Sequence, residues 1–504
     1  MVYKSSITAL ATTIIISGSV AAARLAPRPA DNALQHPFGV SSSSSNRHVQ
    51  AHGRFLHLTD IHMDHHFEYM ATIKSDCHRQ PRKHRKKKLR KGKLAGYWGA
   101  PTSDCDAAPW LVYHALDRIS SEWKDKIDFV VWTGDNARHD SDRKIPRTKK
   151  EIFRLNQEIT NLMRDSFRLD SNNQTIPIVP CIGNNDVYPH NELQPTGDGE
   201  LNDVLEKYSE MWSDFIPFDQ QDVFRKGGYF AVDVAPGIRV LSLNTLYFFN
   251  SNGAVNGCDK DGASRDHLQW IKEQLERARR ERARVYMIGH IPPSSRTFYP
   301  SCLASYVNLS LEYQNIVAGH MYGHLNFDHF LVLRKGKDGD QDDDDDAIEQ
   351  PIHLTADGEI LHATKNVEKY VAKLRRQYRK KASINNAVVV HVAPPLLPIY
   401  NPAFRVNQYE TDMTSANFGI WKSYTQYYTD LAYWNQLALD HPDDEKPAPQ
   451  FKEEYSTDAT YGMQDLSQES WLALAHRMTR NSEKSRNLWD VYVKNIFVQT
   501  NQDA

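Results

Sequence analysis

The chain has 504 residues, of which 40% are apolar and 25% are charged, a composition typical of a folded globular protein. Its 61 basic and 63 acidic residues leave a formal charge of −2, which gives no reason to expect a nucleic-acid partner, so any attraction for polyanions has to come from local charge. Only one stretch, near the N-terminus, is apolar for long enough to span a membrane, which excludes a multi-span membrane protein.

That stretch, residues 7–23, carries no charge. It is either a signal peptide cleaved at the small residues Ala21 and Ala23, or a retained signal anchor within residues 1–23 that spans a membrane once. Both alternatives direct the chain into the secretory pathway. The sequons at Asn173 and Asn308 are then eligible for glycans, and disulfides are permitted.

Residues 24–52 are rich in Pro, Ser and Ala and are predicted to form a flexible linker. From there the pattern changes to short apolar runs that are typical of buried strands, separated by amphipathic helical periods. This alternation predicts a layered α/β fold. The strand-like runs are residues 55–59, 127–133, 176–182, 285–288, 316–322 and 387–392, a strand pair is expected over 229–243, and helices are expected around 152–162 and 268–278.

Two charged segments interrupt this pattern, and we expect both to be solvated. Residues 79–93 hold ten Lys or Arg and no acid. They either steer a polyanion toward the site or form a solvated loop without a role in binding. Residues 338–349 hold seven Asp and one Glu, and they open an insert.

The insert is expected over about residues 336–382 and is predicted to be disordered, except for a basic, helix-like stretch near 367–381. The surrounding catalytic domain is predicted over residues 53–435. Residues 436–504 are predicted to form a mainly helical C-terminal extension, in which no chemical motif is evident.

The five cysteines are too scattered for a CxxC zinc site, and their odd number leaves at least one unpaired. Cys77 with Cys105 and Cys258 with Cys302 are the candidate disulfides. Cys181 lies in a predicted strand and is expected to be a buried thiol. Sequence alone does not establish the connectivity.

Five polar clusters stand immediately after five of the apolar runs. Ligands of α/β sheets bind beyond the carboxyl ends of the strands, so these clusters are expected to converge on one site. Carboxylate, amide and imidazole donors without thiolates suit divalent ions such as Zn, Mn, Fe or Mg. The ordered set predicts a site for two metals. The clusters are Asp60-Ile61-His62, Gly134-Asp135-Asn136, Gly183-Asn184-Asn185-Asp186, Gly289-His290 and Gly323-His324-Leu325-Asn326.

The order of these clusters resembles that of the calcineurin-like metallophosphoesterase superfamily, and within it the acid-sphingomyelinase-like branch. The phrases LTDIHMD, GDNARHD, IGNND, YGHLNFDHF and IYNPAFRV are similar to signatures of the fungal vacuolar endopolyphosphatases. The resemblance covers roughly residues 53–430. It implies an α/β fold of four layers, in which helices flank a β-sandwich.

The resemblance also implies how the ligands divide between the two metals. One metal is held by Asp60 and His62, and Asp135 bridges both ions. The second metal is held by Asn184, His290 and His324.

Two positions depart from the superfamily pattern. Asn326 stands where a His usually returns to the first metal, so it is expected to be a weaker ligand, with His320 as a less favoured substitute. Asn185 stands where a His is usual and is a candidate catalytic residue.

His139, four residues after Asp135, corresponds to the residue that protonates the leaving oxygen; the alternative is a solvated loop histidine.

The implied activity is hydrolysis of internal phosphoanhydride bonds of inorganic polyphosphate by a hydroxide that two divalent ions (Mn, Mg, Zn, Co or Fe) activate. The implied location is the vacuole membrane, with one anchor and a lumenal catalytic domain. If the N-terminal segment is cleaved, the protein is expected in the vacuole lumen or is secreted. The alternatives are a sphingomyelinase-like or nucleotide phosphodiesterase, and a non-catalytic, membrane-tethered phosphate-binding protein. A short linker without cysteines stands where sphingomyelinases carry a saposin module, which disfavours a lipid substrate.

Overall fold

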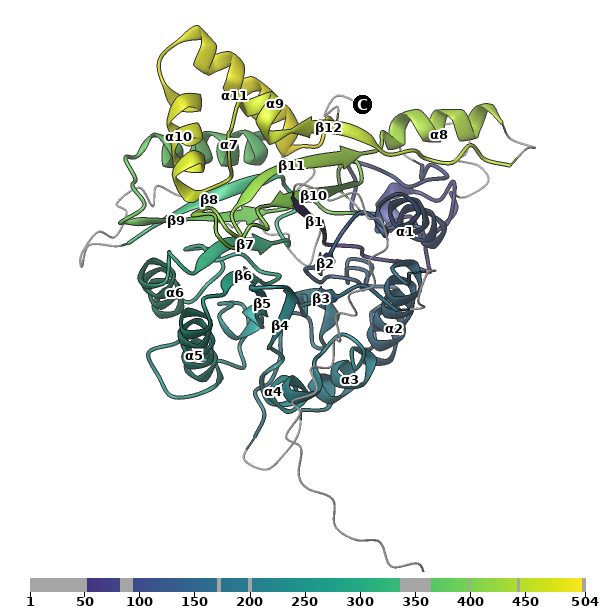
Figure 1. Cartoon of the computed structure of the whole chain (residues 1–504). Coiled ribbons are helices and arrows are strands. Elements are labelled where there is room, and N and C mark those ends of the chain that lie inside the picture. Colours follow the sequence, from purple (N-terminus) through teal and green to yellow (C-terminus); the bar gives the residue numbers. More distant parts are fainter. Residues whose placement is uncertain are drawn as a thin grey trace, which may run out of the picture. The chain divides into compact units, whose positions relative to one another are not determined.

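Two six-stranded sheets form the centre of the structure (Figure 1). The computed structural model describes residues 52–81, 94–169, 174–197, 202–335, 364–397, 399–441 and 445–500. The predicted N-terminal anchor, nearly all of the linker, most of the basic run, the Asn173 sequon and the acidic run lie outside these ranges.

The strands are β1 (Gly53–Leu58), β2 (Phe129–Trp132), β3 (Ile178–Pro180), β4 (Phe230–Ala235), β5 (Ile238–Ser242), β6 (Arg284–Ile288), β7 (Val317–Tyr322), β8 (His329–Arg334), β9 (Ala387–Val392), β10 (Ala403–Tyr409), β11 (Trp421–Tyr428) and β12 (Lys452–Ser456). The helices are α1 (Pro109–Trp123), α2 (Lys149–Ser166), α3 (Asp203–Met211), α4 (Gln221–Gly227), α5 (Ala263–Glu281), α6 (Pro300–Glu312), α7 (Thr364–Arg379), α8 (Leu431–Asp440), α9 (Thr457–Tyr461), α10 (Gln468–Thr479) and α11 (Glu483–Ile496).

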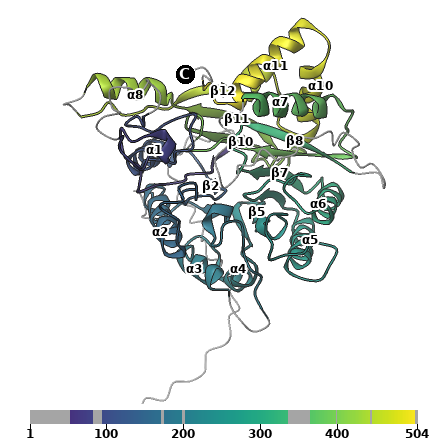
Figure 2. The same cartoon turned by 180° about the vertical axis from the view of Figure 1, so that it is seen from behind.

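Both sheets are mixed, with a parallel centre and antiparallel edges. The first has the order β12-β11-β10-β1-β2-β3, and β1, β2 and β3 run parallel. The second has the order β4-β5-β6-β7-β9-β8, and β5, β6, β7 and β9 run parallel. Helices α1 and α2 lie on the side of the first sheet, and α5 and α6 on the side of the second (Figures 1 and 2). The predicted α/β sandwich flanked by helices is confirmed.

The predicted strands and helices in the described ranges are found near their expected positions. The pair β4–β5 is an antiparallel hairpin, as predicted. Helix α2 begins after Thr148, whose side chain accepts a hydrogen bond from the backbone N–H of Glu151 and so caps the first turn. Its buried face carries Ile152, Leu155 and Ile159.

Aromatic side chains from both sheets pack together in the core. Phe55 of β1 stacks on Phe129 of β2 with ring centroids 4.7 Å apart. Its ring centroid lies 5.6 Å from that of Tyr286 of β6. Trp421 of β11 lies against Gly319 of β7, where an added Cβ would come within 2.2 Å of the indole. Only glycine leaves room for this indole, so position 319 fixes how closely the two sheets approach.

The basic, helix-like stretch expected near residues 367–381 is helix α7, so the end of the insert is ordered. Helix α7 buries Leu374 and Tyr378. The Tyr378 ring stacks on Phe330 of β8 with centroids 4.4 Å apart, and its hydroxyl donates to the Phe330 carbonyl at 2.7 Å. Burial of these large side chains against the second sheet repays the entropy of ordering the helix.

The region predicted as a C-terminal helical extension contains α9, α10 and α11, and it also supplies β12 to the first sheet. The boundary expected after residue 435 falls inside α8. No helix in the described ranges is both long and apolar enough to cross a membrane.

Both candidate disulfides are present. Cys77 pairs with Cys105 and Cys258 pairs with Cys302. Cys181 is a buried free thiol, as predicted.

A buried ion pair joins two of the sequence phrases that characterise the chain. Arg405, in IYNPAFRV, pairs with Asp328, in YGHLNFDHF, and the two side chains are each 3% exposed. The Arg405 Nε donates to Gln426 at 2.9 Å, and the guanidinium lies 4.5 Å from the Tyr424 ring centroid. The Tyr455 hydroxyl also donates to Asp328. Through these side-chain contacts, Asp328 and Arg405 hold β10, β11 and β12 against the segment that follows β7.

We predict that Asp328→Ala destabilises the protein by about 3–5 kcal/mol, because it leaves the Arg405 guanidinium buried and unpaired. The midpoint of urea unfolding measures the change. Asp233→Ala is the matched control. Asp233 also pairs with an arginine, Arg239, but its side chain is 61% exposed, so a loss under about 1 kcal/mol is expected. Equal shifts in the two variants would contradict the role given to the buried pair.

Candidate metal centre

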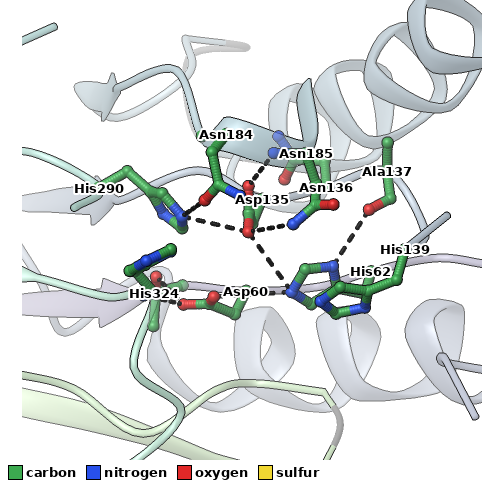
Figure 3. Close-up of polar contacts among 12 residues, drawn as sticks. Asp60, His62, Asp135, Asn136, Ala137, His139, Asn184, Asn185, His290 and His324 are labelled. Atoms are coloured by element: carbon green, nitrogen blue, oxygen red, sulfur yellow. Dashed lines mark hydrogen bonds and ion pairs between the residues drawn. The ribbon is translucent and has the colours of Figure 1, made fainter. Parts of the chain in front are cut away.

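The five polar clusters meet where the carboxyl ends of parallel strands from both sheets come together (Figure 3). The structure thereby brings together six of the predicted ligands. Asp60 and His62 follow β1, Asp135 follows β2, Asn184 follows β3, His290 follows β6 and His324 follows β7.

Several of these residues have left-handed backbone conformations. The φ angles are 51° at Asp60, 42° at His62, 57° at Asp135 and 71° at His324. Such angles cost about 1–3 kcal/mol at residues other than glycine and cluster at functional sites. The tight turns aim each side chain back across the strand ends.

Gly183 lies directly against the central carboxylate. A Cβ at this position would stand 2.2 Å from the Asp135 Oδ1. Any side chain there would displace the Asp135 carboxylate, so the glycine of the GNND phrase is required by close approach.

The first group of candidate ligands is Asp60, His62 and Asp135. The His62 Nε2 lies 3.6 Å from the Asp60 Oδ1 and 3.7 Å from the Asp135 Oδ2. The His62 Nδ1 is 3.1 Å from the Ala137 carbonyl, to which it donates. This hydrogen bond leaves Nε2 facing the carboxylates, the arrangement in which a histidine binds a metal once Nε2 has lost its proton.

The second group shares Asp135 with the first. The His290 Nε2 lies 3.1 Å from the Asp135 Oδ2 and 2.8 Å from the Asn184 Oδ1. Its Nδ1 donates to the Thr133 carbonyl at 2.8 Å. One nitrogen of His324 lies within 4.8 Å of the ligand atoms of Asp135 and His290. Asp135 is thus the member common to both groups, as a bridging ligand would be.

The charges of the site favour cations. Burial alone would lower the pKa of His62, but the carboxylates of Asp60 and Asp135 raise it to about 9. Burial likewise opposes protonation of His290, and Asp135 raises its pKa to about 9. Burial and the neighbouring His290 lower the pKa of His324 to about 3. The carboxylates therefore attract positive charge to this centre.

Unpaired buried atoms at the centre fit bound divalent ions. The Asp60 Oδ1 and the His62 Nε2 are fully buried and have no hydrogen-bond partner in the described chain. Such atoms are costly unless a partner satisfies them. Carboxylate oxygen and imidazole nitrogen are suitable donors for the ions predicted from the sequence.

His139 is held beside the first group by a residue that the sequence prediction did not assign. Its Nδ1 lies 2.7 Å from Asp106 Oδ1, and its backbone N–H donates to Asp106 Oδ2 at 2.6 Å. The ring stacks on His62 with centroids 4.0 Å apart. Asp106 thus fixes the orientation of the ring through Nδ1. The Cys105-Asp106 pair was the available sequence signal.

Asn185 contacts the central carboxylate. Its side-chain Nδ2 donates to Asp135 Oδ2 and its backbone N–H to Asp135 Oδ1, both at 2.8 Å. Its own Oδ1 is buried without a partner in the described chain. The next residue, Asp186, was also not assigned from sequence. It accepts hydrogen bonds from the backbone N–H groups of Asp135 and Asn136, each at 2.8 Å, and so anchors the bridging turn.

Asn326 and His320 have different surroundings. Asn326 is 2% exposed, and its Oδ1 has no partner within the described ranges, as a free ligand atom would have none. His320 lies inside β7 and its Nδ1 bonds the Tyr306 hydroxyl at 2.7 Å. This contact explains the burial of His320 without a metal, in agreement with the expectation that it is the less favoured ligand.

Comparison with known families decides the classification. The pattern described as calcineurin-like phosphoesterase matches residues 53–325, more than half of the chain. The chain belongs to this family. Membership implies divalent metal ions, in agreement with the donor set.

Curated relatives are similar over much of the chain. An endopolyphosphatase from Cryptococcus neoformans is 36% identical over 74% of this chain and 60% of its own length. The Debaryomyces hansenii endopolyphosphatase is 38% identical over 56% of this chain and 39% of its own length. The one from Saccharomyces cerevisiae is 30% identical over 79% of this chain and 67% of its own length. The matched part of this chain thus spans less than two thirds of the length of the first two relatives.

We predict that Asp135→Asn removes bound metal and abolishes phosphoester hydrolysis, because both groups lose their shared anionic ligand. Metal content after dialysis and turnover are the two measurements. Asp125→Asn, the same change on an exposed residue, is the control and should leave both unchanged. Full activity in a folded Asp135→Asn protein would contradict a bridging role.

Proposed function

We propose that this chain is an endopolyphosphatase, which hydrolyses internal phosphoanhydride bonds of inorganic polyphosphate with two divalent ions. The observation that carries the proposal is its 30–38% identity to fungal proteins of that name. The convergence of Asp, His and Asn side chains described above supports the same chemistry.

Each predicted ligand has a role in holding the ions. In this scheme Asp60 and His62 would hold one ion, with Asn326 as a weaker additional ligand. Asp135 would be shared by both ions, and Asn185 orients its carboxylate. Asn184, His290 and His324 would hold the second ion. When bound, such ions supply a nucleophile at neutral pH and neutralise charge on phosphoryl oxygens.

The chain's own contribution to bond cleavage is proton transfer. His139 donates a proton from Nε2 to the oxygen that leaves phosphorus, while Asp106 stabilises the protonated ring through Nδ1. The ring takes its proton back from water before the next turnover. A shortened polyphosphate is itself a good leaving group, so this proton matters less for polyphosphate than for an alkyl ester.

Time courses with long-chain polyphosphate test the proposal. We predict that chain length falls quickly while free orthophosphate rises slowly, because cleavage falls on internal bonds. Gel electrophoresis would then display a ladder of shrinking intermediates. Full-length chains persisting beside orthophosphate would indicate attack from the ends. Cleavage of sphingomyelin or nucleotide phosphodiesters without cleavage of polyphosphate would favour the phosphodiesterase alternative. Absence of turnover on all of these substrates would favour a non-catalytic phosphate-binding protein.

We predict that His139→Ala slows cleavage of an alkyl phosphodiester by about 10²–10⁴-fold, the usual contribution of general acid catalysis, and slows polyphosphate cleavage much less. Steady-state rates on both substrates measure the difference. Metal content serves as the control, since His139 stacks on the ligand His62. Equal losses on both substrates at unchanged metal content would contradict the acid role.

We further propose that the protein resides at the vacuole membrane, with residues 7–23 as a single anchor and the catalytic domain in the lumen. The sequon residue Asn308 is exposed on α6, which suits glycosylation. The protein is then expected to remain with membranes in alkaline carbonate and to lose mass on removal of N-glycans. A mature N-terminus after Ala23 would indicate a cleaved signal and a lumenal or secreted protein.

A further inference from the structure

Four arginines are buried in the described chain, and three of them pair with carboxylates. Arg138 bonds Glu151 at 2.8 Å, Arg239 bonds Asp233 at 2.7 Å, and Arg405 pairs with Asp328. The fourth, Arg147, is 3% exposed. It has no carboxylate within ion-pair distance among the described residues.

Most of the hydrogen-bonding capacity of Arg147 is unused. Its Nη1 donates to the carbonyls of Arg138 and Asn185, at 2.8 and 2.7 Å. Its Nε is buried without a partner, and no described residue bonds its Nη2. A guanidinium has five N–H donors, so three of them have no partner among the described residues. The carboxylates of Asp140 and Asp135 favour its charge without forming an ion pair with it in the described chain, so an anion bound to the guanidinium would offset the cost of burying this charge.

Arg147 lies beside the proposed reaction centre. The Asn185 residue whose carbonyl it contacts donates its side-chain amide to Asp135 at 2.8 Å. The Arg138 residue whose carbonyl it contacts immediately precedes His139. Arg147 therefore lies against the backbone of two segments of the site, one that contacts the bridging ligand and one that carries the proposed proton donor.

We propose that Arg147 binds the phosphate unit of polyphosphate adjacent to the one being cleaved. The inference rests on the proposed function and adds a specificity determinant to it. The fork of a guanidinium matches two phosphate oxygens, and such charge-assisted bonds are strong. A substrate with a single phosphorus atom cannot use this contact, so Arg147 selects substrates with consecutive phosphates.

Kinetics on two substrates test the proposal with the metal-loaded full chain. We expect Arg147→Met to lose roughly 10- to 100-fold in kcat/KM on long-chain polyphosphate, as for loss of a charged hydrogen bond. The loss on bis(p-nitrophenyl) phosphate, which has one phosphorus atom, should be less than about threefold on the same reasoning. Equal losses on the two substrates would overturn the proposal and leave Arg147 a structural role.

Calorimetric binding gives a readout that does not depend on turnover. The probes are orthophosphate and imidodiphosphate, a non-hydrolysable molecule with two phosphates. Arg147→Met should weaken imidodiphosphate roughly tenfold and leave orthophosphate unchanged. Lys144→Met is the matched control, because it removes an exposed positive charge from the same loop and should change neither affinity.

If Arg147→Met does not fold, Arg147→Lys decides, since it keeps the charge and loses the fork. It should weaken imidodiphosphate by a few-fold, on the order of threefold, relative to orthophosphate. An unchanged ratio of the two affinities would overturn the proposal. Failure of the wild type to cleave polyphosphate would instead refute the proposed function, and the binding comparison would still test Arg147.

Discussion

Negative charge buried at the ends of neighbouring parallel strands is the constraint on which this structure depends. Asp60 and Asp135 follow β1 and β2 and are 0% and 2% exposed. Buried carboxylates need positive partners or several hydrogen bonds. Asp135 obtains part of this from His290 and Asn185, whereas the Asp60 Oδ1 has no partner in the described chain. Divalent cations held by these groups would resolve the imbalance.

The rest of the fold holds these groups in place. The two sheets direct the carboxyl ends of β1, β2, β3, β6 and β7 to one place, so that ligands from distant parts of the sequence converge. Asp186 anchors the turn that carries Asp135, and Asp106 anchors His139. Among the buried arginines of the described ranges, Arg147 alone forms no ion pair with a carboxylate, which is the basis for proposing substrate phosphate as its partner.

The sequence predicted the strands before the polar clusters, because apolar runs buried on both faces are continuous and easy to see. It did not predict β10 and β11. Their buried faces include Arg405 and Gln426. These polar residues are stable inside because Asp328, distant in the sequence, pairs with Arg405, and Arg405 and Glu454 bond Gln426. The ligand clusters were identifiable as motifs. The roles of Asp106 and Asp186 were not, because both residues act through hydrogen bonds that only the folded chain reveals.

Anomalous diffraction from crystals grown with Mn²⁺ or Zn²⁺ tests the central claim most directly. The account predicts two anomalous peaks about 3.5–4 Å apart, the usual spacing of two-metal sites. One peak should lie among Asp60, His62 and Asp135, and the other among Asp135, His290 and His324. A single peak, or peaks that Asp135 does not bridge, would contradict it.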